Sequence, residues 1–471
     1  MNKAIYIATS EQNSGKSIIT LGLMSMLMGK MAKVGYFRPI IEDIEEGGFD
    51  NHIETVIGHF GMDIEFEDAY AITKSKLIKK KNKGKIGEVL DLIIEKYKKL
   101  EERFDFVLVE GTGFTGEGTV IELDMNVLIA KNLGIPTIIV GSGAGKTLEE
   151  LIDSLYLLYD SFKVKDVEVL AVIANKVQLQ NIELVTNSLK KSLPQNILVN
   201  SIPLIQNLNN PTVQEIVNEL DAKVLFGAAH LNNQTGSFSV GAMQLRNYLL
   251  HLKENSLVIT PGDRADIILG ALQANESLNY PTISGIVLTG NIVPEDSILK
   301  LIEGLSTIVP IIAVEEGTYF ITNKIGSIKS KIYANNKQKI KISIATFEKY
   351  VDLDNLAEKL ITFEAEGMTP KMFQYNLVKR AREHRKHIVL PEGNDERIIR
   401  AASRLLEMDV VAISVIGNKK QIESKVLELG LFFDFSKVQI INPIESEHFD
   451  DYVNTYYELR KAKNVTIEMA K

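Results

Sequence analysis

The chain has no cysteine and few histidines. Because it has 0 cysteines among 471 residues, disulfides, thiolate catalysis and cysteine-ligated zinc are excluded. The 7 histidines are scattered, and none forms the HxxxH or HExxH pair of a histidine metal site. No apolar run is long enough to span a membrane, and the N-terminus lacks the hydrophobic region of a signal peptide. We therefore expect a cytoplasmic protein without a membrane partner.

The chain also lacks an excess of positive charge. It carries 53 Lys and Arg against 61 Asp and Glu, and the resulting net charge of −8 argues against a nucleic-acid partner. A hydrophobic content of 45% is ordinary for a globular protein, and the length predicts about three domains.

The first part of the chain alternates short β-branched runs with helical patterns. This alternation is typical of an α/β domain with a parallel sheet and crossover helices, and we predict such a domain over residues 1–218. The predicted strands cover residues 4–8, 34–37, 106–109, 137–140, 167–174 and 197–201. The predicted helices include residues 16–29, 85–103, 147–159 and 182–193.

A second α/β unit is predicted over residues 219–352. Its expected strands cover residues 224–226, 256–260, 285–289 and 311–313. Residues 353–369 are predicted as a linker, because their last part, FEAEGMT, is short, acidic and contains glycine. A third α/β unit is expected over residues 370–471.

Residues 10–17, SEQNSGKS, follow a strand and open a helix, as a Walker-type phosphate loop does. Main-chain N–H groups around Ser14 and Gly15 could surround a phosphate, and Lys16 would reach the terminal phosphates of a nucleotide. The first glycine of the motif is replaced by Ser10, which leaves the loop less free at that end.

Ser17 and Glu110 are the candidate magnesium residues. The hydroxyl of Ser17, next to the phosphate-loop lysine, would hold the ion. Glu110 follows the predicted strand 106–109, and an acidic residue at that strand end can position the same ion.

Together with Arg38 and Asn175, these segments resemble the dethiobiotin-synthetase-like P-loop domain, which also forms the N-terminus of long phosphate acetyltransferases. The resemblance implies ATP and Mg²⁺ as candidate ligands. A dethiobiotin synthetase would carry lysine in place of Arg38, and GTGFTG at residues 111–116 replaces that family's GAGG. The open alternatives are a nucleotide-binding loop, a structural turn that has lost its nucleotide and, disfavoured by Arg38, an ATP-dependent ligase.

The middle unit carries Asp263 and Arg264 after one predicted strand, and Thr289, Gly290 and Asn291 after another. These pairs resemble the DRTGG domain, which implies a regulatory and assembly module. Asn291 stands where that family has its second glycine. The alternative for Asp263 and Arg264 is a salt-bridged turn that only holds the domain together.

Residues 388–402, IVLPEGNDERIIRAA, predict a buried parallel strand, a turn and a helix. Pro391 and Gly393 interrupt the strand. Asn394 or Asp395 is expected to cap the helix that follows. A loop of this kind lies where open α/β sheets place ligands.

With YELRKAK at residues 457–463, this stretch resembles the start of the phosphate acetyl/butyryl transferase domain. The resemblance covers residues 370–471 and implies the reaction acetyl-CoA + phosphate ⇌ acetyl phosphate + CoA in acetate metabolism, without a cofactor. It also implies that Arg460 and, as a second candidate, Arg397 bind substrate; each could instead form a surface salt bridge.

The resemblance further implies a homo-oligomer. The family's catalytic residues are expected beyond residue 471, because the chain ends early in that domain, so we expect the chain to be inactive alone. The alternative function is a non-catalytic, nucleotide-binding regulatory or assembly module.

Overall fold

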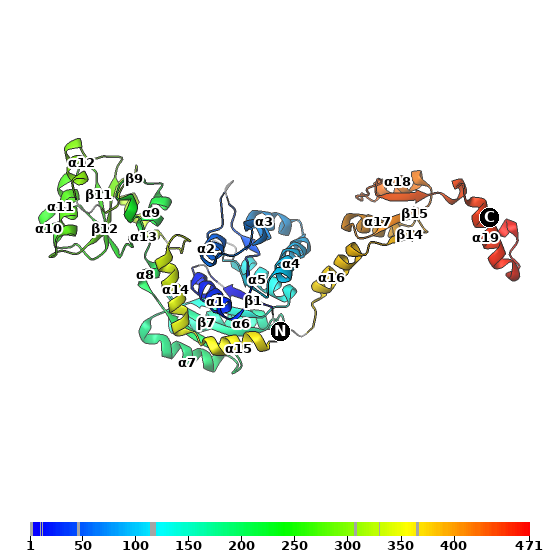
Figure 1. The fold of residues 1–471 in the computed structure, drawn as a ribbon, viewed down its shortest axis with the longest axis horizontal. Coiled ribbons are helices and arrows are strands. Elements are labelled where there is room, and N and C mark those ends of the chain that lie inside the picture. Colours follow the sequence, from blue (N-terminus) through cyan, green and yellow to red (C-terminus); the bar gives the residue numbers. More distant parts are fainter. Residues whose placement is uncertain are drawn as a thin grey trace. The chain divides into compact units, whose positions relative to one another are not determined.

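The computed structural model describes residues 3–9, 11, 13–44, 48–113, 119–305, 309–328, 330–363 and 367–471, with only the main chain for residues 119–123. The chain forms two compact units, residues 1–367 and residues 368–471 (Figure 1). The first unit contains two α/β domains, each built on its own sheet. No helix in the described part of the chain is long and apolar enough to cross a membrane.

The first domain is built on a parallel sheet with strand order β2-β5-β1-β6-β7-β8. Its strands are β1 (Ala4–Thr9), β2 (Val34–Phe37), β5 (Phe106–Glu110), β6 (Thr137–Ser142), β7 (Val169–Val177) and β8 (Leu198–Pro203). Nearly all of their residues are buried, because helices cover both faces of the sheet. The parallel sheet predicted from the sequence is confirmed.

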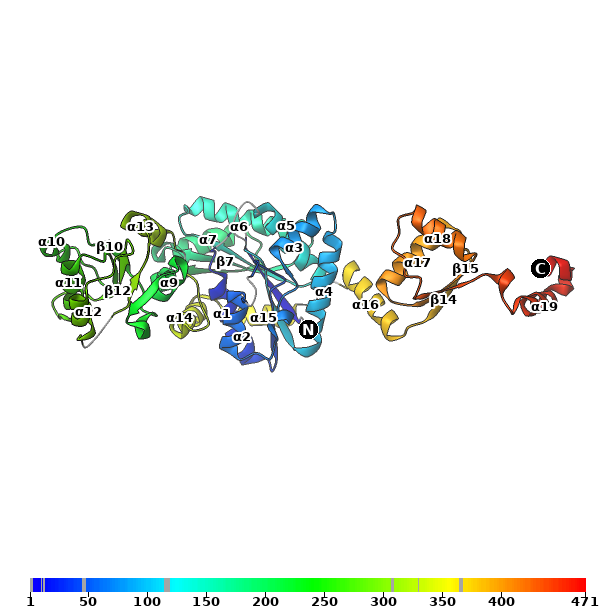
Figure 2. The same cartoon turned by 90° about the horizontal axis from the view of Figure 1, so that it is seen from above.

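Helices on the two faces come from different parts of the chain (Figure 2). One face carries α1 (Lys16–Lys30), α14 (Lys337–Tyr350) and α15 (Leu353–Thr362). The other carries α4 (Ile86–Arg103), α5 (Thr119–Leu133), α6 (Leu148–Lys163) and α7 (Ile182–Ser192). Smaller elements of the domain are β3 (Ile40–Ile41), β4 (Ile72–Thr73), α2 (Asn51–Phe60), α3 (Lys74–Asn82) and α8 (Gln206–Asn209), with 3-10 turns at Phe66–Asp68 and Leu179–Asn181.

The segment 337–362 packs on the first sheet, although the sequence assigned it to the middle domain and to a linker. Helix α14 lies along α1, and α15 lies against β7. The linker predicted over residues 353–369 is therefore helical up to Thr362. The reason is a buried apolar stripe on α15, formed by Leu356, Ala357 and Leu360.

A buried ion pair ties α14 to α9 (Val213–Leu220). The Nζ of Lys339 lies 2.8 Å from Oε2 of Glu215, and both side chains are buried. Glu215 also accepts hydrogen bonds from the main-chain N–H groups of Thr212 and Lys331. Its carboxylate thus joins the start of α9, the segment before α14 and α14 itself.

The middle domain has a sheet with strand order β10-β11-β12-β13-β9, in which only β9 is antiparallel to its neighbour among the described strands. Its strands are β9 (Lys223–Phe226), β10 (Ser237–Val240), β11 (Ser256–Pro261), β12 (Ile283–Thr289) and β13 (Ile311–Ala313). Its helices are α9, α10 (Leu245–Leu249), α11 (Ala265–Glu276), α12 (Asp296–Glu303) and α13 (Thr318–Ser327), with a 3-10 turn at Ala228–His230.

Apolar cores form on both faces of this middle sheet. Helices α11 and α12 cover one face, and α9 and α13 cover the other. Helix α9 thus belongs to the middle sheet, although most of it lies within the predicted first domain, residues 1–218.

Residues 368–471 contain a parallel sheet with strand order β14-β15-β16. Its strands are β14 (His387–Leu390), β15 (Ala412–Ile416) and β16 (Val438–Ile441). Its helices are α16 (Pro370–Glu383), α17 (Glu396–Met408), α18 (Lys419–Glu428), α19 (Phe449–Arg460) and α20 (Ile467–Ala470), with 3-10 turns at Pro443–Glu445 and Lys461–Lys463.

The prediction of a buried strand at β14 is wrong. Ile388 is 37% exposed and Val389 is 53% exposed. The reason is that β14 is an edge strand, which pairs with β15 alone among the strands of the described residues. The turn and helix that follow are confirmed, and Asp395 caps α17 by accepting the main-chain N–H of Arg397.

Candidate functional site

Helix α1 begins after Gly15, whose φ of 80° lies in the left-handed region. A Cβ atom on Gly15 would lie 2.2 Å from Nδ2 of Asn175, so only glycine fits there. The same Nδ2 donates to the main-chain oxygen of Ser14 at 2.8 Å. The hydroxyl of Ser14 is buried and has no hydrogen-bond partner among the described residues. Ser10 lies outside the described residues.

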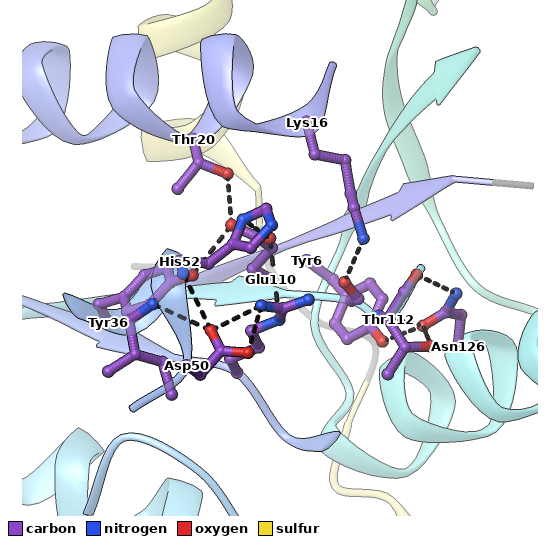
Figure 3. Close-up of polar contacts among 12 residues, drawn as sticks. Tyr6, Lys16, Thr20, Tyr36, Asp50, His52, Glu110, Thr112 and Asn126 are labelled. Atoms are coloured by element: carbon purple, nitrogen blue, oxygen red, sulfur yellow. Dashed lines mark hydrogen bonds and ion pairs between the residues drawn. The ribbon is translucent and has the colours of Figure 1, made fainter. Parts of the chain in front are cut away.

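Lys16 points from the start of α1 toward the loop that follows β5 (Figure 3). Its Nζ donates to the main-chain oxygen of Gly111 at 2.7 Å, and its side chain is buried. The loop is fixed in turn by Asn126 of α5, whose Oδ1 accepts from the N–H of Thr112 at 3.0 Å and from the hydroxyl of Tyr6 at 2.7 Å. Lys16 thus connects two segments of the protein itself. Residues 114–116 of the GTGFTG motif lie outside the described residues.

Glu110, at the end of β5, is fully buried and its carboxylate is surrounded by protein groups (Figure 3). Its Oε2 accepts hydrogen bonds from the hydroxyls of Thr20 at 2.8 Å and Tyr36 at 2.9 Å. Its Oε1 lies 3.0 Å from Nδ1 of His52 and 3.9 Å from Nε of Arg38. Oε2 therefore has two hydrogen-bond donors, whereas Oε1 has ion-pair contacts but no hydrogen-bond partner among the described residues.

Arg38 lies between two buried carboxylates. Its Nη1 donates to both oxygens of Asp50, at 2.7 and 2.8 Å. Asp50 also caps α2 by accepting the main-chain N–H groups of His52 and Ile53. Burial lowers the pKa of Arg38, but the charges of Asp50 and Glu110 outweigh that effect and raise its pKa above the ordinary value. The guanidinium stays charged and is held by the protein.

The same balance keeps Glu110 ionised. Burial raises the pKa of Glu110, but the close contact with His52 and the charges of Arg38 and Lys16 outweigh it, so that the pKa lies well below its usual range. The protein thus supplies the positive charge that a metal ion would otherwise provide.

The described residues do not fit a magnesium ion at Glu110. Oε2 of Glu110 already has two donors. Oε1 has no hydrogen-bond partner among the described residues, but the neighbouring Arg38 would repel a cation there. Ser17 lies in the same narrow crevice as Glu110, but no group of three or more metal-ligating side chains occurs among the described residues. The magnesium role of Ser17 and Glu110 therefore stays a prediction.

The crevice is bordered by a segment that follows the middle domain along the chain, between α13 and α14. Ile332 lines it, and the main-chain oxygen of Ile332 accepts hydrogen bonds from Nδ2 of Asn51 at 2.9 Å and the hydroxyl of Thr55 at 3.1 Å. Asn51, Thr55, His52 and Asp50 were not predicted as site residues. The one local signal was the helix-capping Asp50, which marks the start of α2 but not its contact with Arg38.

In the middle domain, the two predicted motif pairs lie at neighbouring strand ends. A Cβ atom on Gly262, after β11, would lie 1.8 Å from the main-chain oxygen of Ile292, so the two loops touch. Thr289, at the end of β12, is buried, and its hydroxyl lies 2.7 Å from that of Thr318. Gly290 and Asn291 both have positive φ, 82° and 55°. Asparagine tolerates this left-handed conformation, so it can replace the family's second glycine.

Arg264 holds this end of the sheet together. Its guanidinium donates to the main-chain oxygens of Gly241 at 3.1 Å and Met243 at 2.8 Å, and it pairs with Asp266 at 2.8 Å. Asp263 is exposed. The geometry supports the salt-bridged turn, with Asp266 as the acidic partner of Arg264.

The two candidate substrate-binding arginines differ in their surroundings. Arg397 is 86% exposed and pairs with Asp395 through contacts of 2.9 and 3.2 Å, which lower the pKa of Asp395 to about 2. Arg460, in the last turn of α19, is exposed and forms no ion pair with any described residue. Arg460 is therefore the more available of the two for an anionic ligand.

Comparisons with known proteins cover the whole chain. Family models described as AAA domain, DRTGG domain and phosphate acetyl/butaryl transferase match residues 3–228, 215–328 and 372–471. The chain is 38% identical to a phosphate acetyltransferase of Nitratidesulfovibrio vulgaris, over 100% of this chain and 67% of that protein. It is 37% identical to one of Synechocystis sp., over 100% of this chain and 68% of that protein. A solved phosphotransacetylase from Streptococcus pyogenes is 33% identical over 22% of this chain and 30% of that chain, with a TM-score of 0.20.

Proposed function

The chain belongs to the phosphate acetyltransferase family, and we propose that residues 372–471 bind substrate for the transfer of an acetyl group between acetyl-CoA and phosphate. The observation that carries the proposal is the 38% identity that extends over the whole chain. The family expected from residues 388–402 and 457–463 is thereby confirmed. The products are acetyl phosphate and CoA, and the reaction requires no cofactor.

Within this part of the chain, Arg460 is the proposed contact to the phosphate groups of coenzyme A or to inorganic phosphate. An exposed guanidinium can bind two phosphate oxygens at once. Arg397 would first have to leave Asp395, so it is the weaker candidate. A cytoplasmic location and a homo-oligomeric state belong to the same proposal. The location rests on the lack of a long apolar run in the sequence, and the oligomeric state rests on the family resemblance.

The test measures phosphate-dependent release of free thiol from acetyl-CoA by the purified protein, together with calorimetric binding of CoA. We expect the Arg460→Ala variant to weaken CoA binding by about tenfold, which corresponds to the loss of one charge-assisted contact. The matched control is Arg404→Ala, because Arg404 is also an exposed arginine of this unit. If the protein neither binds CoA nor releases thiol, the proposed function is wrong. If Arg460→Ala binds CoA like the parent, the role of Arg460 is wrong.

A second candidate function is the binding of a nucleotide phosphate by residues 14–17. The buried, unpartnered hydroxyl of Ser14 at the start of α1 favours it, as does the match to an AAA domain over residues 3–228. Lys16 would have to exchange the oxygen of Gly111 for a phosphate oxygen. We propose binding without hydrolysis, because Glu110 and Arg38 are held by other residues of the protein.

Titration with ATP, with and without Mg²⁺, tests this second function. Binding that is lost in Lys16→Ala and unaffected by Mg²⁺ would support it. The absence of binding would leave residues 14–17 as a structural turn. Hydrolysis of ATP that Lys16→Ala abolishes would instead favour ligase chemistry.

A further inference from the structure

A polar hollow opens at the amino ends of β11 and β12, which is the end of the middle sheet away from the Arg264 and Thr289 motifs. Its volume of about 440 Å³ lies within the range of roughly 300–1,000 Å³ typical of small-molecule sites. Most of its lining consists of amide side chains, namely Asn232, Asn233, Gln234, Asn255, Asn275 and Gln338. These residues come from four separate segments of the chain, so no sequence motif reveals them.

Some of the lining groups support the walls of the hollow. Nδ2 of Asn233 donates to the main-chain oxygen of Ser284 at 3.2 Å. Oδ1 of Asn275 accepts the main-chain N–H of Ile283 at 2.9 Å. Glu254, next to the hollow, is held by the hydroxyl and N–H of Thr282. These contacts fix the first residues of β12 and keep the amino end of the sheet in place.

Two other lining groups have no such role. The hydroxyl of Ser284 and the Nε2 of Gln234 are buried atoms without a hydrogen-bond partner among the described residues. The side chain of Ser284 is 2% exposed. Buried polar groups in folded proteins nearly always have a partner, and a molecule bound in the hollow could supply one to these two groups.

The charges of the hollow limit what that ligand can be. Lys, Arg, Asp and Glu do not occur among the lining residues that the structure describes, and the one titratable lining group is the exposed His230. A phosphate or carboxylate would therefore enter without a compensating charge. Amide side chains offer a donor and an acceptor side by side, which matches the edge of a nucleobase. Ile283 and Val309 add apolar surface for a flat ring.

We propose that this hollow binds the base of an uncharged nucleoside, with Ser284 and Gln234 as hydrogen-bonding residues. The residues that line the hollow include none of residues 14–17 or 372–471, and the proposal does not depend on the function of either segment.

The test is calorimetric titration of the purified protein with adenosine, guanosine, cytidine and uridine, with free ribose as the comparison. We expect at least one nucleoside to bind more tightly than ribose. The Ser284→Ala variant removes only an unpartnered hydroxyl, so its thermal midpoint should not fall, while its affinity for that nucleoside should fall by about fivefold or more.

The chain offers a matched control for this variant. Ser256, at the start of β11, is also a buried serine whose hydroxyl has no partner among the described residues, but it does not line the hollow. Ser256→Ala should therefore bind the nucleoside within about twofold of the parent. If Ser284→Ala fails to fold, Gln234→Leu replaces it, with the same expected loss of affinity. The proposal is overturned if none of the four nucleosides binds more tightly than ribose, or if the nucleoside binds equally well to the Ser284 or Gln234 variant.

Discussion

Gly22 of α1 lies so close to Phe347 of α14 that a Cβ atom on Gly22 would be 2.1 Å from Cγ of the ring. A glycine inside a helix costs about 0.5–1 kcal/mol relative to alanine. Here the missing side chain lets a fully buried phenylalanine pack on the helix backbone. The glycine thus allows two helices from distant parts of the sequence to meet on one face of the sheet.

The first prediction follows from this contact. Gly22→Ala should lower the free energy of unfolding by about 1–3 kcal/mol, because the new methyl group overlaps the ring of Phe347. Gly29→Ala, in the last turn of the same helix, has no atom within 4 Å of the new Cβ and should raise the free energy of unfolding by about 0.5–1 kcal/mol. Urea denaturation measures both variants. Equal stability of the two would contradict the packing described for Gly22.

The second prediction concerns the ion pair of Arg38 with Asp50. Asp50→Asn should lower the free energy of unfolding by about 3–5 kcal/mol, because it removes the main partner of a buried guanidinium. The control is Glu95→Gln, which breaks an exposed pair with Lys99 in the same domain and should change stability by less than about 1 kcal/mol. Denaturant midpoints with an unchanged slope would measure the difference. Similar losses in the two variants would count against the buried pair.

The third prediction is a pH dependence caused by Glu110. Its pKa is lower in the folded protein than the ordinary value of 4.5, so the unfolded chain binds more protons as the pH falls. The stability that the ionised carboxylate contributes is thus complete above about pH 5 and is lost progressively as the pH falls toward the folded pKa.

The Glu110→Gln variant lacks this titration. We expect it to be less stable than the parent at neutral pH, and the difference between the two should shrink from about pH 5 downward. Unfolding midpoints recorded between about pH 3 and pH 7 give the two profiles. If the profiles stay parallel throughout, Glu110 is not the group responsible.

The fourth prediction concerns Lys339 and Glu215. Lys339→Met should lower the free energy of unfolding by about 3–5 kcal/mol, because the buried carboxylate of Glu215 loses its charged partner. The double variant Lys339→Met with Glu215→Gln removes both charges and should recover part of that loss. A double-mutant cycle by denaturation measures the coupling. Strictly additive losses would show that the two residues do not act as a pair.

The sequence predicted most strands of the first two sheets, because each strand is a local apolar run. The predicted bounds of β2 and β13 agree with the structure at both ends. The exposure of β14 could not be predicted, because its run of apolar residues resembles that of a central strand and only its position at the sheet edge distinguishes it.

The sequence predicted only those parts of the candidate site that local patterns of strands and helices indicate. The position of Lys16 and Glu110 follows from the strand and helix pattern, and both lie where that pattern placed them. Their partners do not follow from it, because Arg38, Asp50 and His52 reach Glu110 through the tertiary fold. The amide-lined hollow could not be predicted for the same reason, since its residues are far apart in the sequence and only the fold brings them together.

The return of α14 and α15 to the first sheet makes the N-terminal domain discontinuous along the chain. The middle domain is therefore an insertion in the first domain, because the chain on both sides of it belongs to the first domain. A proteolytic fragment that stops near residue 218 would lack α14, which packs on α1. The apolar surface that Phe347 buries would then be exposed. A variant in which a short linker replaces the middle domain and joins the first domain to the start of α14 would keep both faces of the first sheet covered.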